Sequence, residues 1–79
     1  MRILVVEDDA DLSRQLKSAF KDAGYAVDVA KDGEEGHFLG DTEPYDAVVL
    51  DLGLPLIDGA SVLHKWRADG KTSPVLILT

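Results

Sequence analysis

Three carboxylates follow directly on short apolar runs in this 79-residue chain. Glu7 and Asp8 come after residues 3–6 (ILVV), and Asp51 comes after residues 47–50 (AVVL). Continuous runs rich in β-branched residues are typical of strands that are covered on both faces in a parallel sheet. If the two strands are neighbours, the three acids converge at one edge of the sheet. A hard divalent cation would make such a cluster tolerable, and Mg²⁺ fits best because it prefers oxygen ligands and no His or Cys lies nearby.

Four other aspartates stand at or near the starts of predicted helices or turns. These are Asp9, Asp11, Asp32 and Asp58. A short carboxylate at this position accepts a hydrogen bond from a backbone N–H of the first helical turn. We therefore interpret these four acids as caps and not as part of a binding site.

The elements that must position the strand-end acids alternate between strands and helices. Strands are expected at residues 3–6, 25–30, 47–50 and 75–78, the second of them more polar and suited to a sheet edge. Apolar residues at helical spacing predict helices over about 9–23, from 33 to about 39, and after Asp58. Gly36 and Gly40 weaken the second helix, and Trp66 is expected to pack the third.

This order, βαβαβαβ, predicts an α/β fold. Right-handed parallel crossovers give an open, doubly wound sheet with helices on both faces. Ligands of such sheets bind beyond the carboxyl ends of the strands, where the strand order reverses. The strand-end acids lie at that edge.

Composition agrees with a small folded domain. Apolar residues make up 46 % of the chain and charged residues 29 %, and there is no cysteine to form a disulfide. The net charge of −7 disfavours direct binding to nucleic acid. No apolar run approaches the roughly 20 residues that span a bilayer, and the N-terminal residues do not have the pattern of a signal peptide. A cytoplasmic protein without membrane contact is expected.

The segment after the third predicted strand is the sharpest local signal. Residues 51–59 (DLGLPLIDG), together with residues 5–8 (VVED) and 76–79 (LILT), resemble the receiver domain of two-component response regulators. The resemblance is strongest to the OmpR/PhoB group, including the PhoP type, and covers residues 2–79. It implies the flavodoxin-like (CheY-like) fold and a signalling protein that regulates transcription, not an enzyme.

The resemblance also implies a role for each matching residue. Asp51 would be phosphorylated by a partner sensor histidine kinase. Asp8 would bind Mg²⁺ directly, Glu7 through water and Gly53 through its backbone carbonyl, and the ion would bridge Asp51 and the phosphoryl oxygens. Thr79 would act as the switch, its hydroxyl donating a hydrogen bond to a phosphoryl oxygen. The chemistry agrees, because a carboxylate can form an acyl phosphate when a metal screens the transferred group.

The same resemblance predicts the extent of the domain. Residues 1–79 would form the first two-thirds of a receiver domain, cut after the fourth strand, and a DNA-binding output domain would be absent. Contact with DNA is expected only through that output domain. Residues 75–78 would form an edge strand with unpaired backbone groups and uncovered apolar side chains. We therefore expect self-association through this strand.

Two other functions stay open. A metal-dependent aspartyl-phosphate phosphatase or phosphotransferase would use the same nucleophile. A haloacid-dehalogenase-like phosphatase, however, needs a second acid two positions after the nucleophile, where Gly53 stands. The other alternative is an interaction or scaffold fragment that is not phosphorylated. A nucleotide-binding Rossmann domain is disfavoured because no G-x-G-x-x-G follows the first strand.

Four further residues have structural interpretations. Pro55 and Gly59 are expected to shape the loop after Asp51, Pro55 through its fixed φ and Gly59 through a positive φ. His37 and His64 fall on separate predicted helices without the spacing of metal ligands, so we expect surface histidines.

Overall fold

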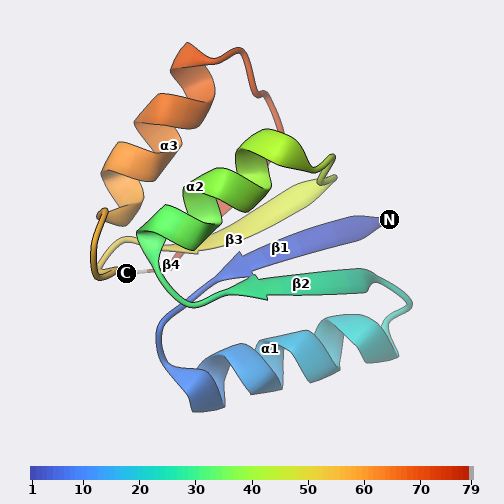
Figure 1. Ribbon diagram of the computed structural model, residues 1–79. Helices are drawn as coiled ribbons and strands as arrows, with labels where there is room; N and C mark the ends of the chain where they lie inside the picture. Colours follow the sequence, from blue (N-terminus) through green and yellow to red (C-terminus); the bar gives the residue numbers. More distant parts are fainter. Residues whose placement is uncertain (79) are drawn as a thin grey trace.

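The computed structural model describes residues 1–78, which form four strands and three helices in alternation (Figure 1). In chain order these are β1 (Arg2–Val6), α1 (Ala10–Asp22), β2 (Ala26–Ala30), α2 (Gly33–Thr42), β3 (Ala47–Asp51), α3 (Gly59–Ala68) and β4 (Val75–Leu78). The predicted order of elements is confirmed.

The strands form one parallel sheet in the order β2-β1-β3-β4. Helix α1 covers one face and helices α2 and α3 cover the other (Figure 1). Strand β1 lies between β2 and β3, and Val6 pairs with Leu50. The doubly wound, flavodoxin-like α/β fold is therefore confirmed, and the strands that precede the acids are neighbours.

Helix α1 forms as its sequence pattern predicts. Asp9 is the N-cap, and its side chain accepts hydrogen bonds from the N–H groups of Asp11 and Leu12. Gly24 follows the helix with φ 97°, the left-handed conformation that glycine adopts without strain. Asp11 is not a cap, contrary to our expectation. It lies in the first turn and forms an ion pair with Arg14.

Helix α2 is longer than predicted, continuing past Leu39 to Thr42. The glycines that were expected to weaken it are contact points. A Cβ on Gly36 would lie 2.6 Å from a methyl group of Val6, and one on Gly40 would lie 2.4 Å from the indole of Trp66. Packing of the helix against strand and neighbouring helix outweighs the low helix propensity of glycine.

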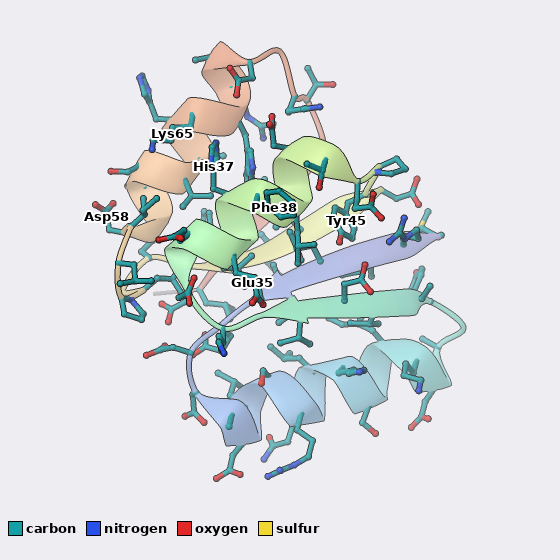
Figure 2. All side chains as sticks on the ribbon, viewed as in Figure 1. Glu35, His37, Phe38, Tyr45, Asp58 and Lys65 are labelled. Atoms are coloured by element: carbon teal, nitrogen blue, oxygen red, sulfur yellow. The ribbon has the colours of Figure 1, made fainter. Side chains whose placement is uncertain are left out.

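Helix α3 packs beside α2 over the main core, and Figure 2 shows the side chains on both helices. Asp58 is its N-cap, accepting from the N–H of Ser61 at 2.9 Å. Trp66 is buried as predicted, and its indole N–H donates to the carbonyl of His37 at 3.3 Å. None of the helices within residues 1–78 is both long and apolar enough to cross a membrane.

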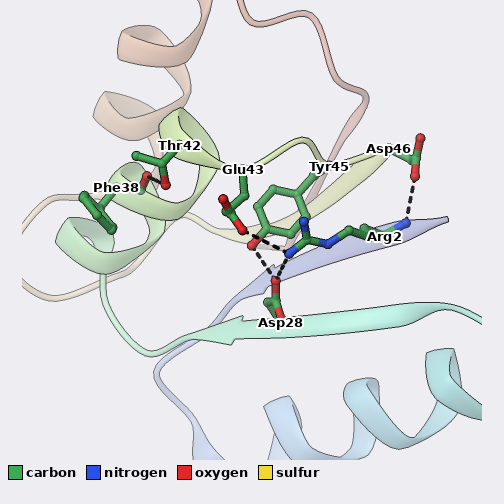
Figure 3. Close-up of polar contacts among 7 residues, drawn as sticks. All are labelled: Arg2, Asp28, Phe38, Thr42, Glu43, Tyr45 and Asp46. Carbon is green, nitrogen blue, oxygen red and sulfur yellow. Dashed lines mark hydrogen bonds and ion pairs between the residues drawn. The ribbon is translucent and has the colours of Figure 1, made fainter.

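A polar network joins strands β1 and β2 to the segment between α2 and β3, away from the strand-end acids (Figure 3). The hydroxyl of Tyr45 donates to Asp28 at 2.7 Å, and Arg2 donates to the same carboxylate oxygen at 2.8 Å. The Arg2 guanidinium also lies over the Tyr45 ring, 5.1 Å from its centroid, and reaches Glu43 at 3.4 Å. The network cross-links three separate segments of the chain.

Strand β4 is one edge of the sheet, as predicted. Its Leu76 is 62 % exposed. On the face that α1 covers, an open apolar depression of about 370 Å³ lies between the start of β4, strand β3 and Phe20 of α1. Helix α1 therefore covers only part of this face.

Candidate acidic site at the carboxyl ends of the strands

The three predicted strand-end acids meet. One carboxylate oxygen from each of Glu7, Asp8 and Asp51 lies within 4.8 Å of the others. Glu7 and Asp8 follow β1 and Asp51 ends β3, and the two strands are paired up to Val6 and Leu50. Residues 43 or 44 positions apart in sequence are thereby brought to one point.

Glu7 is the buried member of the cluster, with 5 % of its surface exposed. Its carboxylate accepts a hydrogen bond from the N–H of Asp9 at 3.1 Å. Burial raises the pKa of Glu7, and the nearby charges of Asp51 and Asp8 raise it further, whereas the Asp9 hydrogen bond opposes the shift. A buried carboxylate among like charges is a strong attractor for a cation.

Asp51 is partly exposed and held in a defined orientation. The N–H of Gly53 donates to its Oδ1 at 3.0 Å. Gly53 itself is exposed, and only Asp51 Oδ1 approaches the position that a Cβ would occupy, at 3.8 Å. The Gly53 N–H therefore holds the Asp51 carboxylate in place, and the carboxylate stays accessible to a group that arrives from solvent.

The loop after Asp51 is locked to the start of α2. The N–H of Gly33 donates to the carbonyl of Pro55 at 3.2 Å, and a Cβ on Gly33 would lie 1.7 Å from the carbonyl oxygen of Ile57. No residue larger than glycine fits there without displacing the loop.

Gly59 was expected to shape this loop through a positive φ, and that reason is wrong. Gly59 does not have a positive φ; a Cβ there would lie 2.2 Å from the carbonyl oxygen of Asp51, so the position requires close approach instead. The left-handed residue in this loop is Leu56, with φ 69°. Nothing in the sequence signals this, because leucine is rarely found in that conformation.

The donor set fits Mg²⁺. All three side chains offer carboxylate oxygens that lie within 4.8 Å of one another. Mg²⁺ prefers oxygen ligands and keeps several waters, so it can be held by carboxylates directly or through water. Neither His37 nor His64 belongs to the cluster, so the nitrogen ligands that would favour zinc are lacking among the described residues. His37 is partly buried and His64 is exposed.

Two predicted site features are not tested by this geometry. The backbone carbonyl of Gly53 stays a predicted ligand, since only the N–H of that residue has an assigned partner. The predicted switch residue, Thr79, lies outside the described residues.

Known proteins share this sequence pattern. The family model of the response regulator receiver domain matches residues 3–79. The chain is 48 % identical over all its 79 residues to the transcriptional regulatory protein QseB of Haemophilus influenzae, of which it spans 36 %. It is 43 % identical, again over its full length, to the transcriptional regulatory protein PhoP of Escherichia coli, of which it spans 35 %. The chain thus covers about a third of these relatives.

Solved structures share the fold as well. The response regulator TrrA of Thermotoga maritima, solved in complex with Mg²⁺ and BeF, superposes with a TM-score of 0.92 at 36 % identity. The match covers 99 % of this chain and 68 % of TrrA. TrrA in complex with the histidine kinase ThkA superposes with a TM-score of 0.89 at the same 36 % identity, over 99 % of this chain and 67 % of that one.

Proposed function

The chain belongs to the response regulator receiver domain family, and on that premise we propose that it is a phosphoacceptor whose Asp51 receives a phosphoryl group from a sensor histidine kinase. One observation carries the proposal: Glu7, Asp8 and Asp51 meet within 4.8 Å at the carboxyl ends of two central strands. The complex of TrrA with a histidine kinase supports the choice of donor.

In the proposed reaction, a carboxylate oxygen of Asp51 attacks the phosphorus of a phosphohistidine on the kinase. The new O–P bond forms as the N–P bond breaks, and the electron pair of that bond stays on the imidazole nitrogen. The Gly53 N–H keeps the carboxylate oriented during the attack. The product is an acyl phosphate on Asp51.

We assign the cation-binding role to Glu7, Asp8, Asp51 and the carbonyl of Gly53. Mg²⁺, when bound, supplies neutralisation of the charge on the transferred phosphoryl oxygens. The crowding of buried Glu7 by two like charges supports this role, as does the Mg²⁺ in the TrrA complex. The switch role of Thr79 rests on the resemblance of residues 76–79 to the family pattern alone.

We further propose that residues 1–79 are part of a longer receiver domain joined to a DNA-binding output domain, in a QseB- or PhoP-type regulator. The support is the identity of 48 % and 43 % to those regulators, of which the chain spans about a third. Such a regulator is not an enzyme of metabolism, and it works in the cytoplasm, where its DNA lies. DNA contact would come from the output domain.

No observation favours the two alternative functions. A haloacid-dehalogenase-like phosphatase lacks its second acid at Gly53. A scaffold without phosphorylation would not need three carboxylates at the sheet edge.

Incubation with acetyl phosphate and Mg²⁺ tests the phosphoacceptor role. Intact-mass spectrometry should show one added phosphoryl group on the wild-type chain and on Asp22→Asn, a matched substitution at the exposed end of α1. Asp51→Asn should show none. Equal phosphorylation of the wild type and Asp51→Asn, or none in any variant, would contradict the assignment of Asp51.

Thermal unfolding with and without Mg²⁺ tests the cation site separately. A ligand that binds only the folded state raises the unfolding temperature. We expect Mg²⁺ to stabilise the wild type and Asp22→Asn and to have no effect on Asp8→Asn. Stabilisation without phosphorylation would leave a cation-binding module and remove the phosphoacceptor role.

We also propose that the exposed β4 edge makes this chain self-associate. Size-exclusion chromatography with light scattering should show a mass that rises with concentration, and Leu76→Lys should reduce this rise because charge protects a strand edge. A monomer at high micromolar concentration would refute this proposal.

A further inference from the structure

A second surface feature, separate from the acidic site, is a hollow between α2 and the loop after β3. Its volume is about 450 Å³. The lining residues are Asp32, Glu34, Glu35, His37, Phe38, Asp41 and Leu56. None of them belongs to the Glu7, Asp8 and Asp51 cluster.

Two large apolar side chains in this hollow are open to solvent. Phe38 on α2 is 63 % exposed and Leu56 in the loop is 73 % exposed. Figure 2 shows Phe38 on α2, on the side that faces away from α3. The exposure of single apolar residues is ordinary, but two of them lining one concave site form a contact surface.

The backbone of Leu56 adopts a strained conformation. Its φ of 69° lies in the left-handed region, where glycine or asparagine would be favoured. Contacts on both sides of Leu56 keep the loop in this conformation. The carbonyl of Pro55 accepts a hydrogen bond from Gly33 at the start of α2, and the carbonyl of Ile57 packs closely against Gly33. Residues with a strained backbone are concentrated at functional sites.

The charges around the apolar pair are of one sign. Asp32, Glu34, Glu35 and Asp41 contribute four carboxylates, and no Lys or Arg lines the hollow in the part of the chain that the structure describes. The carboxylate of Asp32 also accepts from the Glu35 N–H as the helix cap, so the other three are the more available. An apolar pair ringed by carboxylates is complementary to an apolar side chain flanked by cations.

We propose that this hollow is a docking site for a partner-protein segment that carries an apolar side chain with Arg or Lys beside it. The apolar side chain would contact Phe38 and Leu56, and the cationic groups would pair with Glu34 and Asp41. A second copy of this chain is disfavoured because the same carboxylates would face each other. The proposal is independent of phosphorylation at Asp51 and goes beyond the receiver function.

The test uses a short synthetic peptide in which one leucine is flanked on each side by arginine, and a control peptide with serine in place of leucine. Titration into the ¹⁵N-labelled chain, followed by ¹⁵N–¹H spectra, gives both the site and the affinity. We expect the leucine peptide to shift the resonances of Phe38 and Leu56 and to bind more tightly than the serine peptide. Raising the salt concentration should weaken the binding.

Variants separate the apolar and charged contributions. Phe38→Ser should lower the affinity for the leucine peptide about tenfold, which is the loss typical of one anchoring side chain. Asp22→Lys, which reverses a charge at the exposed end of α1 outside the hollow, should leave the affinity unchanged. Asp41→Lys should also weaken binding. The dispersion of each variant's spectrum shows that it is folded.

Several results would overturn the proposal. These are no binding of the leucine peptide, equal binding of the two peptides, unchanged affinity in Phe38→Ser, or shifts confined to Glu7, Asp8 and Asp51. A concentration-dependent dimer that Phe38→Ser abolishes would assign the hollow to a second copy and would also refute the partner-segment proposal.

Discussion

Removal of the Tyr45 hydroxyl should destabilise the chain by an amount that depends on pH at both extremes. Tyr45 is 7 % exposed, and its hydroxyl donates to Asp28 at 2.7 Å. A hydrogen bond to a charged group contributes about 1.5–3 kcal/mol, and screening at the 43 % exposed Asp28 side chain reduces this to roughly 1–1.5 kcal/mol. Tyr45→Phe keeps the ring and its contact with Arg2, so the loss isolates the hydrogen bond.

The loss of stability at alkaline pH follows from the Tyr45 phenol. Burial raises its pKa, and the hydrogen bond to Asp28 raises it further. Because the folded-state pKa lies above the unfolded value of about 10, the stabilisation is complete below pH 10 and is lost as the pH rises toward the folded-state pKa. The wild type should therefore lose up to about 1.4 kcal/mol per pH unit relative to Tyr45→Phe above pH 10.

The loss of stability at acid pH follows from Asp28. The Tyr45 hydrogen bond lowers its pKa, with a further contribution from Arg2, although burial acts in the opposite direction. For a lowered pKa the stabilisation is present above the unfolded value of about 3.9 and is lost as the pH falls through the folded-state pKa. The advantage of the wild type over Tyr45→Phe should shrink below about pH 4.

Urea unfolding of both proteins from pH 3 to pH 11, at one low protein concentration, measures these two losses of stability. The difference in the free energy of unfolding should be flat between about pH 5 and pH 9 and should decrease on both sides. A difference that is constant over the whole range, or a Tyr45→Phe variant as stable as the wild type at pH 7, would refute this reasoning.

Three further substitutions test packing, capping and backbone strain by the same unfolding assay. Gly40→Ala should lower the free energy of unfolding by about 1–2 kcal/mol, because the added Cβ meets the Trp66 indole, and by much less in a Trp66→Leu background. Equal losses in the two backgrounds would exclude that contact. Asp32→Ala should cost about 1 kcal/mol by removing the α2 cap, whereas Asp41→Asn at the other end of the helix should cost little. Leu56→Asn should stabilise the chain by several tenths of a kcal/mol to about 1 kcal/mol, since asparagine tolerates a positive φ, and a loss of stability would show that Leu56 packs in the fold.

The elements and the strand-end acids could be predicted because local patterns determine them. The β-branched runs before Glu7 and Asp51 specify buried parallel strands, and neighbouring parallel strands place their following residues together. Asp9 marks the start of α1 in the sequence, and it caps the helix as expected.

Features that depend on contacts between distant segments could not be predicted. The extension of α2 past Leu39 depends on Gly40 meeting Trp66, which is 26 positions away in the sequence. The steric requirement at Gly59 depends on the path of the Asp51 backbone, and the conformation of Leu56 depends on how the loop is tied to α2. Local propensity carries no information about these approaches.

Because β1 pairs with β3, the acidic cluster depends on the register between these two strands. Val6 lies opposite Leu50, which brings the following acids level with each other. A slip of one residue would move Asp51 by about 3.3 Å along the strand and turn its side chain to the other face of the sheet. A cation that requires Glu7 and Asp51 together would therefore bind only correctly aligned chains. Its titration during refolding would report when the two central strands reach their native alignment.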